Sequence, residues 1–341
     1  MTMKIILDGF GGDNAPLEIL RGAAAAAQTG AELVLTGDEK KLRDTARENG
    51  IAVDGLTFVH APDVIRMEDH PKSILREKKD CSMAVALRLL ADGEGDAVVS
   101  AGSTGALLMG ATFLVGRIKG VSRPALAPVL PSAKEAYMLL DSGANADCRP
   151  EMLLQFARMG SIYMRRMFPE RGEPRVGLLN VGTEDTKGGE LQQAAFPLLR
   201  DSGLHFIGNV EARDVPLGVA DVVVADGFSG NVLLKTMEGT SQLIMGLLKD
   251  GLTASLRTKL GAALVMPALR GLKKKMSTSE YGGAVLLGVK CPVIKAHGNA
   301  KAKDIASAVR VAASFAESGA IDEIAAAVRK TDKTETKESD G

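Results

Sequence analysis

Six polar loops rich in glycine follow apolar runs along the chain, and their residue types suit them to bind phosphate. They occupy residues 8–16, 100–105, 141–145, 180–189, 208–214 and 226–231, and several open a helical pattern. Free backbone N–H groups at the start of a helix, together with hydroxyls and a lysine, can hold inorganic phosphate or a phosphoryl group. Gly, Asn and Asp are also ordinary turn formers, which accounts for any one loop more readily than for all six. The chemistry indicated is transfer to or from phosphate.

Signatures of several other chemistries are absent from the sequence. GxGxxG does not follow a strand, and GxxxxGK[ST], HExxH and GxSxG do not occur. A zinc protease and an α/β-hydrolase are therefore disfavoured. The three cysteines have no metal-ligand spacing, so we expect unreactive buried thiols in a reducing, cytosolic setting. They are Cys81, Cys148 and Cys291.

Short runs rich in Val, Ile and Leu alternate with longer helical patterns, which is typical of strands buried on both faces of a parallel sheet. The expected strands are residues 4–7, 32–36, 56–59, 96–99, 137–140, 175–179, 205–207 and 221–225. The alternation predicts a doubly wound α/β fold in one unit over residues 1–329, followed by a disordered polar tail at 330–341. Because ligands bind beyond the carboxyl ends of parallel strands, we expect the six loops to line one long cleft.

Charge and composition exclude further function classes. The 341 residues carry 42 Lys+Arg against 42 Asp+Glu, with no Trp and three Tyr. A net charge of zero and few aromatic side chains argue against binding to nucleic acid. No secretory signal is expected, since the apolar run at 3–7 ends at Asp8. The uncharged stretch at 97–116 is interrupted by glycines and a polar loop, so no membrane span is expected there.

Residues 251–279 contain six basic residues and no acidic one. Leucines recur every three or four residues in this segment, and Pro267 separates two such patterns. We therefore expect a protruding helical hairpin over about 240–278 with an uncharged tip at 261–269. Flanking basic residues favour anionic headgroups, so the tip is expected to touch a membrane surface through Leu264, Val265, Met266 and Leu269. The leucine stripe is expected to pack against a second copy of the chain.

Eight blocks in order along residues 3–319 make the chain resemble the PlsX family of phosphate acyltransferases of bacterial phospholipid synthesis. The blocks are DGFGGDNAP at 8–16, SAGSTGALLMGATFLVGRIKGVSRPALAP at 100–128, LLDSGAN at 139–145, GLLNVGTEDTKG at 177–188, FIGNVEARD at 206–214, ADGFSGNVLLKTMEG at 225–239, YGGA at 281–284 and VIKAHG at 293–298. The chain departs from the family pattern at Phe10 and Ser103, where the family more often has Met and Asn. Neither difference alters the resemblance.

The resemblance implies conversion of acyl-[acyl-carrier-protein] and inorganic phosphate into acyl phosphate and free carrier protein. Bound phosphate would attack the thioester directly, without a covalent enzyme intermediate. Phosphate is an anionic nucleophile at neutral pH and a thiolate is a good leaving group, so positioning and oxyanion stabilisation suffice. The resemblance also implies an isopropylmalate-dehydrogenase-like, three-layer α/β/α fold with no cofactor and no metal.

The partners implied by the resemblance are a second copy of the chain, acyl carrier protein and a membrane-bound glycerol-3-phosphate acyltransferase that takes the acyl phosphate. The expected location is the cytoplasm, with peripheral association at the inner face of the cell membrane. Because carrier protein is acidic, a basic docking patch is needed. The candidates for that patch are Arg76, Lys78 and Lys79.

By match to the family motifs, Lys187 in TEDTKG and Asn231 in GFSGN form the central pair. Lys187 would neutralise the phosphate or the developing oxyanion, and Asn231 would donate to the thioester carbonyl or orient phosphate. His297 in KAHG would protonate the departing thiolate. The residues expected to bind phosphate are Ser103, Thr104 and Gly105, with Asn145 and Asn180 as further candidates.

Each of the three catalytic roles has a plainer alternative. The alternative for Lys187 is a solvated loop charge, for Asn231 a helix N-cap, and for His297 a hydrogen-bonded structural residue. Two other functions compete at the level of the whole chain. One is an NAD-dependent 2-hydroxy-acid dehydrogenase of the same fold, and the other is a membrane-associated scaffold without catalytic activity.

Overall fold

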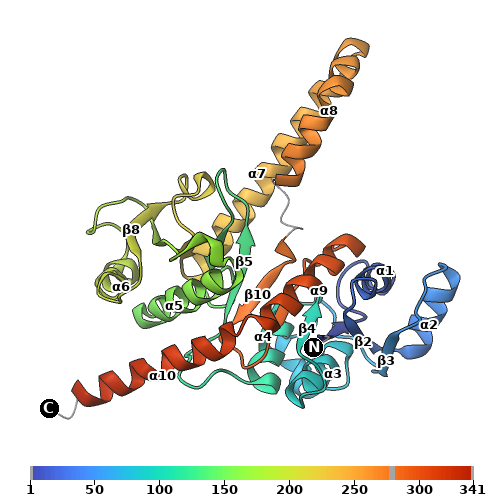
Figure 1. The fold of residues 1–341 in the computed structure, drawn as a ribbon, viewed down its shortest axis with the longest axis horizontal. Coiled ribbons are helices and arrows are strands. Elements are labelled where there is room, and N and C mark those ends of the chain that lie inside the picture. The colour runs from blue at the N-terminus through green and yellow to red at the C-terminus, as the bar shows by residue number, and fades with distance from the viewer. Residues whose placement is uncertain (1–2, 276–280, 339–341) are drawn as a thin grey trace.

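The computed structural model describes residues 3–275 and 281–338, and a single mixed sheet lies at its centre (Figure 1). The order of the eleven strands in the described residues is β3-β2-β1-β4-β11-β10-β5-β6-β9-β7-β8. Their bounds are β1 Lys4–Asp8, β2 Glu32–Gly37, β3 Leu56–His60, β4 Ala97–Ser100, β5 Ala125–Leu130, β6 Tyr137–Leu140, β7 Val176–Asn180, β8 Phe206–Glu211, β9 Val222–Val224, β10 Ala284–Leu287 and β11 Val293–Lys295. All eight strands expected from the sequence are present, and β5, β10 and β11 were not anticipated.

The two halves of the sheet run in opposite directions. β1, β2, β3, β4 and β11 are mutually parallel, whereas β10 is antiparallel to both β11 and β5. β5 is antiparallel to β6, and β6, β9, β7 and β8 are parallel to one another. We call the carboxyl ends of β1, β4 and β11 the first edge, and those of β6, β9 and β7 the second edge.

The prediction that all six loops line one edge is therefore wrong. The loops at 8–16 and 100–105 lie at the first edge, whereas the other four follow strands that run the opposite way. The reversal occurs at β10 and β6, each of which pairs antiparallel with β5. Local sequence patterns reveal where a strand ends but not its direction in the sheet, which depends on long-range pairing.

Helices cover both faces of the sheet, which gives the expected three-layer α/β/α architecture (Figure 1). In β1, the side chains of Ile5 and Leu7 join one buried cluster with α1 and α9, while Ile6 joins another cluster with α3 and α4. This alternation follows from the two-residue period of a strand. The helices are α1 Leu17–Ala27, α2 Glu39–Glu48, α3 Ser82–Ala91, α4 Thr104–Gly110, α5 Pro150–Met167, α6 Glu190–Arg200, α7 Gly227–Thr253, α8 Leu256–Lys275, α9 Ala302–Glu317 and α10 Ala320–Glu338.

The expected hairpin is formed by α7 and α8, which pack side by side and project from the body of the molecule (Figure 1). Its tip lies at 254–255 and not at the predicted 261–269. Ser255 and Thr258 cap the start of α8 reciprocally, with Thr258 N donating to Ser255 Oγ at 3.2 Å and Ser255 N to Thr258 Oγ1 at 2.9 Å. This capping begins the second helix earlier than the leucine pattern suggested. Pro267 lies inside α8.

The residues predicted for membrane contact consequently lie along α8. The side chain of Leu264 is 82% exposed, Val265 and Met266 are also exposed, and Leu269 is half-buried. Of the six basic residues in the segment, Arg257 and Lys259 are exposed, and the other four side chains lie outside the described residues. Residues 276–278 of the predicted hairpin lie outside them as well.

The C-terminal segment differs from the predicted disordered tail, because α10 continues to Glu338. Residues 330–338 alternate lysine, threonine and acidic residues and contain neither Pro nor Gly, so nothing in them interrupts a helix. The remaining residues, 339–341, lie outside the described part of the chain. No helix in the described part is both long and apolar enough to cross a membrane.

Candidate functional site

The loop after β6 is organised by the carboxylate of Asp141, which is fully buried. Its oxygens accept hydrogen bonds from the backbone N–H groups of Leu126 at 3.0 Å, Gly143 at 3.2 Å, Ala144 at 3.1 Å and Asn145 at 2.6 Å. Burial raises the pKa of Asp141, while hydrogen bonds to its oxygens act in the opposite direction. This one side chain therefore fixes the conformation of the loop at the second edge.

Asn145 completes the same loop. Its side-chain amide donates to Pro124 O at 2.8 Å and to Asp141 Oδ2 at 2.9 Å, and only 4% of the residue is exposed. Both amide hydrogens are thus used within the protein. The residue expected to bind substrate instead joins the loop to the start of β5 and has no side-chain donor left for a ligand.

The first turn of α7 rests directly on this loop. Asp226 caps the helix by accepting from Ser229 N at 2.8 Å, and Gly227 N donates to Asn145 O at 2.7 Å. A Cβ atom at Gly230 would lie 1.9 Å from Asp141 O, so only glycine permits this approach.

Asn231 follows this contact and is exposed at the second edge. The Cβ position of Gly143 lies 3.5 Å from Asn231 Oδ1, which places the amide over the loop after β6. The helix cap is Asp226, so Asn231 is not the N-cap of α7. Its side chain is therefore available for the role predicted from the family motif.

The loop after β7 carries Lys187. Asn180, which is 9% exposed, accepts from Val181 N at 2.8 Å and donates to Lys187 O at 3.0 Å. The Lys187 side chain is 49% exposed, and its ammonium lies 3.8 Å from Glu184 Oε1. Asn180 therefore positions the backbone of Lys187, while the ammonium remains accessible at the surface. Since β9 lies between β6 and β7, this loop and Asn231 belong to the same edge.

The other predicted residues lie at the first edge. Ser103 Oγ accepts from Ala106 N at 3.5 Å, so Ser103 is the N-cap of α4, and Thr104 and Gly105 form the first turn of that helix. His297 is exposed, and its backbone carbonyl accepts from Ala300 N at 3.0 Å. The structure thus groups Ser103, Thr104, Gly105 and His297 at one edge and Asn145, Asn180, Lys187 and Asn231 at the other.

Two buried charged residues at the first edge were not anticipated. Asp8, at the end of β1, is 2% exposed and accepts from Ser82 Oγ at 2.5 Å and Ser100 Oγ at 2.6 Å. Lys295, at the end of β11, is 8% exposed. Burial raises the pKa of Asp8 and lowers that of Lys295 to about 8. In the sequence, Lys295 closes an apolar run and stands in the VIKAHG block, where only His297 was assigned a role.

The three thiols have raised pKa values. Burial raises the pKa of Cys81 and of Cys148 to about 11, and burial also raises the pKa of Cys291. Cys81 is buried as expected, but Cys148 and Cys291 are half-buried. All three are predominantly protonated at neutral pH, so none is an activated nucleophile.

The basic residues considered for docking are only partly free. Lys78 forms an ion pair with Asp63 at 2.9 Å, and this hydrogen bond raises the pKa of Lys78 and lowers that of Asp63. Arg76 and Lys79 are exposed. Within residues 3–275 and 281–338, no three His, Cys, Asp or Glu side chains gather in a group that could hold a metal ion.

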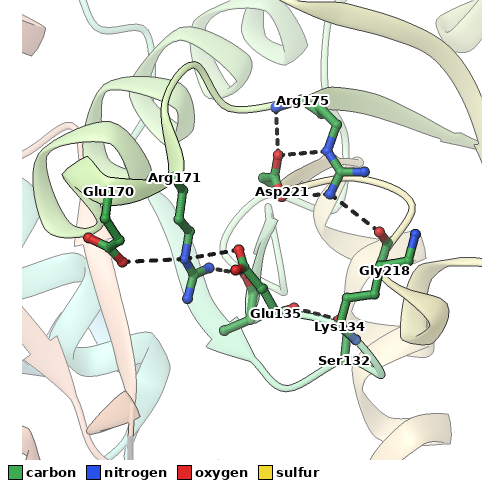
Figure 2. A network of polar contacts seen from close by, with 9 residues as sticks. Ser132, Lys134, Glu135, Glu170, Arg171, Arg175, Gly218 and Asp221 are labelled. Atoms are coloured by element: carbon green, nitrogen blue, oxygen red, sulfur yellow. Dashed lines mark hydrogen bonds and ion pairs between the residues drawn. The ribbon is translucent and has the colours of Figure 1, made fainter.

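A separate polar network ties the turn between β5 and β6 to β7 and β9 (Figure 2). Arg175 forms a bidentate pair with Asp221, at 2.9 Å from Nε and 2.8 Å from Nη2, and its Nη2 also donates to Gly218 O at 3.3 Å. Arg171 lies 3.3 Å from Glu135. Burial alone would raise the pKa of Asp221, but the hydrogen bonds from Arg175 outweigh it and lower the pKa. These contacts join the segments that precede β7 and β9, and they fix the turn between β5 and β6 to the residues after α5.

Comparisons with known sequences agree with this architecture. The family model described as "Fatty acid synthesis protein" matches residues 3–323. A phosphate acyltransferase of Geobacillus thermodenitrificans is 50% identical over 334 residues, covering 96% of this chain and 100% of the relative. A phosphate acyltransferase of Thermoanaerobacter pseudethanolicus is 49% identical, covering 94% of this chain and 96% of the relative.

Solved structures share the fold at much lower identity. The EutD phosphotransacetylase from Staphylococcus aureus superimposes with a TM-score of 0.60 at 18% identity, covering 92% of this chain and 94% of that chain. A 4-hydroxythreonine-4-phosphate dehydrogenase from Klebsiella pneumoniae gives a TM-score of 0.56 at 16% identity, covering 93% and 100%. These similarities extend to the fold alone, which transferases and dehydrogenases share.

Proposed function

Because the chain belongs to the phosphate acyltransferase family, we propose that this transferase makes acyl phosphate from acyl-[acyl-carrier-protein] and inorganic phosphate. The observation that carries the proposal is the 50% identity to a phosphate acyltransferase over the whole length of that relative. The second edge supports it, because the two family-motif residues Lys187 and Asn231 have accessible side chains there. The acyl phosphate would enter phospholipid synthesis.

The reaction needs no protein nucleophile. A phosphate oxygen attacks the thioester carbonyl carbon, forming a C–O bond and a tetrahedral oxyanion. The oxyanion then collapses, the C–S bond breaks, and the thiolate of the carrier's prosthetic group leaves with its electron pair and takes up a proton. The raised pKa values of Cys81, Cys148 and Cys291 fit direct attack, because none of these thiols is activated.

Lys187 and Asn231 act on the charge that develops in this step. The Asn231 amide donates a hydrogen bond to the carbonyl oxygen as it becomes negative, and the Lys187 ammonium neutralises phosphate or the oxyanion. Asn145 and Asn180 are positioning residues, since their amides hold the loops on which these two groups depend. His297, exposed at the first edge, is assigned the protonation of the thiolate.

The hairpin supports two further proposals. Leu256, Leu260 and Leu264 are 80%, 71% and 82% exposed and recur every four residues on α8, so they form an apolar stripe. We assign Leu256 and Leu260 to contact with a second copy of the chain. We assign Leu264, Val265 and Met266, together with the basic residues of α8, to peripheral contact with the anionic inner face of the membrane. There the product would pass to a membrane-bound glycerol-3-phosphate acyltransferase.

A vesicle assay tests the membrane contact. The double substitution of Leu264 and Val265 by Glu should release the protein from anionic vesicles and leave turnover of acyl carrier protein unchanged. The double substitution of Leu264 and Val265 by Met keeps the apolar surface and serves as the control. Full vesicle binding by the Glu variant would contradict the proposal.

The activity itself is tested by mixing the protein with acyl-[acyl-carrier-protein] with and without inorganic phosphate. We expect phosphate-dependent release of free carrier protein and an acyl phosphate that hydroxylamine traps as a hydroxamate. A change in nicotinamide absorbance with a 2-hydroxy acid, and no carrier release, would instead indicate the dehydrogenase. Lys187→Ala should lower kcat by about 100-fold or more, and full turnover by this variant would contradict the central site.

A further inference from the structure

The ammonium of Lys295 is a buried charge without a close counter-ion. The residue is 8% exposed, and its Nζ donates to the backbone carbonyls of Ala101, at 3.4 Å, and Ala296. No carboxylate of the described residues lies within ion-pair distance of it. A buried ammonium is costly unless an anion or a full set of hydrogen bonds compensates its charge. Two carbonyls leave one of its three N–H groups for another acceptor.

The carboxylates near Lys295 do not contact its ammonium directly. The oxygens of Asp8 accept hydrogen bonds from Ser82 and Ser100, and no ion pair joins Asp8 to Lys295. Asp13 contributes an electrostatic interaction with Lys295 but is exposed to solvent. The Lys295 ammonium is therefore buried with only two backbone carbonyls in direct contact and with no carboxylate paired to it.

The loops around the Lys295 ammonium are held in place by close backbone contacts. Asp13 N donates to Gly298 O at 2.8 Å, and a Cβ atom at Gly12 would lie 2.8 Å from the same oxygen. Lys295 pairs with Ser100 in the register of β11 and β4. The loops after β1, β4 and β11 thus form one preorganised unit around the ammonium.

A second cation, Lys235 of α7, acts on Lys295 from the other half of the molecule. Burial is the main reason that the pKa of Lys295 falls to about 8, and the charge of Lys235 acts in the same direction. Lys235 lies four residues after Asn231, so both side chains are on the same face of α7.

We propose that Lys295 binds the inorganic phosphate that this enzyme uses as acyl acceptor. The assignment rests on the proposed function and adds a phosphate-binding residue from the first edge to it. A phosphate dianion would supply both the counter-charge and the oxygen acceptor that the Lys295 ammonium lacks.

Steady-state kinetics of Lys295→Met test the assignment. We expect KM for inorganic phosphate to rise about 10- to 100-fold, the range for a charge-assisted hydrogen bond, with KM for acyl carrier protein unchanged. Lys295→Arg should recover part of the phosphate affinity, and Lys235→Met should have a smaller effect because its side chain is 56% exposed and paired with Glu238. Lys303→Met, which removes an exposed lysine, is the matched control.

Phosphate binding is also measured without acyl substrate, as the rise in melting temperature of the full chain with increasing inorganic phosphate. We expect this rise in the wild type and the Lys303→Met control, and its loss in Lys295→Met. Retention of the rise and of KM for phosphate in Lys295→Met would overturn the inference. A selective rise in KM for acyl carrier protein would also overturn it, and would assign Lys295 to binding of the carrier protein. The proposed function fails, and the phosphate-binding site stands, if the wild type makes no acyl phosphate but phosphate raises its melting temperature and does not raise that of Lys295→Met.

Discussion

The two edges of the sheet place their charged groups in opposite ways. At the second edge the Lys187 side chain is 49% exposed and the buried polar groups serve the backbone, as Asp141 does. At the first edge Asp8 and Lys295 are themselves buried. An exposed lysine costs little to keep charged, whereas a buried one costs folding free energy. We therefore expect substitution of an exposed residue such as Lys187 to change activity with little effect on stability. Substitution of the buried Lys295 should change both.

The largest expected effect is on the buried anchor of the second edge. Asp141→Ala leaves the N–H groups of Leu126, Gly143, Ala144 and Asn145 without their acceptor. At roughly 1–3 kcal/mol for each unsatisfied buried group, we expect a loss of about 4 kcal/mol or more in the free energy of unfolding. Urea denaturation measures it, with the exposed Asp54→Ala as control. A loss no larger than that of the control would mean that Asp141 does not hold this edge.

Asn231→Ala should separate activity from stability at the same edge. Removing one donor to a developing oxyanion lowers kcat by about 100- to 1,000-fold, equivalent to about 3–4 kcal/mol. Because Asn231 is exposed and is not the cap of α7, the free energy of unfolding should change by less than about 0.5 kcal/mol. Ser229→Ala, which removes a hydroxyl bonded to Asp226, is a neighbouring control on the same helix. An unaltered kcat in Asn231→Ala would contradict its assignment.

At the first edge, Lys295→Met should change stability as well as activity, because it should stabilise the protein at pH 7 in the absence of phosphate. The folded pKa of about 8 lies below the ordinary value of 10.5, so the wild type bears the full cost of the buried charge below pH 8. Between pH 8 and 10.5 the unfolded chain binds the extra proton, and wild-type stability rises with pH. We expect the variant to be more stable by up to about 3 kcal/mol at pH 7.

Denaturation of both proteins from pH 7 to 10.5 in phosphate-free buffer provides the measurement. The advantage of Lys295→Met should shrink steadily above pH 8. The charged groups that act on Lys295 are Asp8, Asp13 and Lys235. Because the charge of Lys235 lowers the pKa of Lys295, the stability of Lys235→Met should rise less between pH 8 and 10.5 than that of the wild type. A difference between wild type and Lys295→Met that does not vary with pH would show that burial of the ammonium is not its source.

The smallest expected effect concerns Ser103. Because Ser103 is the N-cap of α4, Ser103→Ala should lower the free energy of unfolding by about 1 kcal/mol. If the hydroxyl serves only as a cap, KM for phosphate stays unchanged. A rise in KM for phosphate in Ser103→Ala, with Ser103→Thr restoring it, would extend the phosphate site from Lys295 to the loop after β4. Chemical denaturation and steady-state kinetics on the same preparations distinguish these results.

Much of the fold is visible in the sequence, because eight strands are continuous apolar runs such as residues 221–225. The strands that escaped prediction, β5, β10 and β11, lie together in the middle of the sheet. β5 contains Pro128 and β11 is three residues long, so neither has a strong local pattern. β5 and β10 are two of the three strands whose antiparallel pairing reverses the direction of the sheet, and without them the loops were assigned to one edge.

The sequence predicted those site residues whose type and neighbouring motif indicate a role. Lys187 and Asn231 stand in polar, glycine-rich motifs, and the structure leaves their side chains accessible. Asn145 stands in a similar motif, yet its side-chain amide donates to Pro124 O and to Asp141. Pro124 comes near only because β5 pairs with β6. Lys295 was missed because a lysine at the end of a strand is ordinarily at the surface. Its burial depends on loops distant in sequence.

α7 has an anchored part and a projecting part. The helix touches the loop after β6 at Gly230, and Leu233 and Met237 pack against the body of the molecule. From Met237 it extends to Thr253, about 24 Å further along its axis. Asn231 therefore lies within the anchored part. Bending of α7 beyond Met237 moves the outer end of the hairpin and leaves the backbone of Asn231 in place.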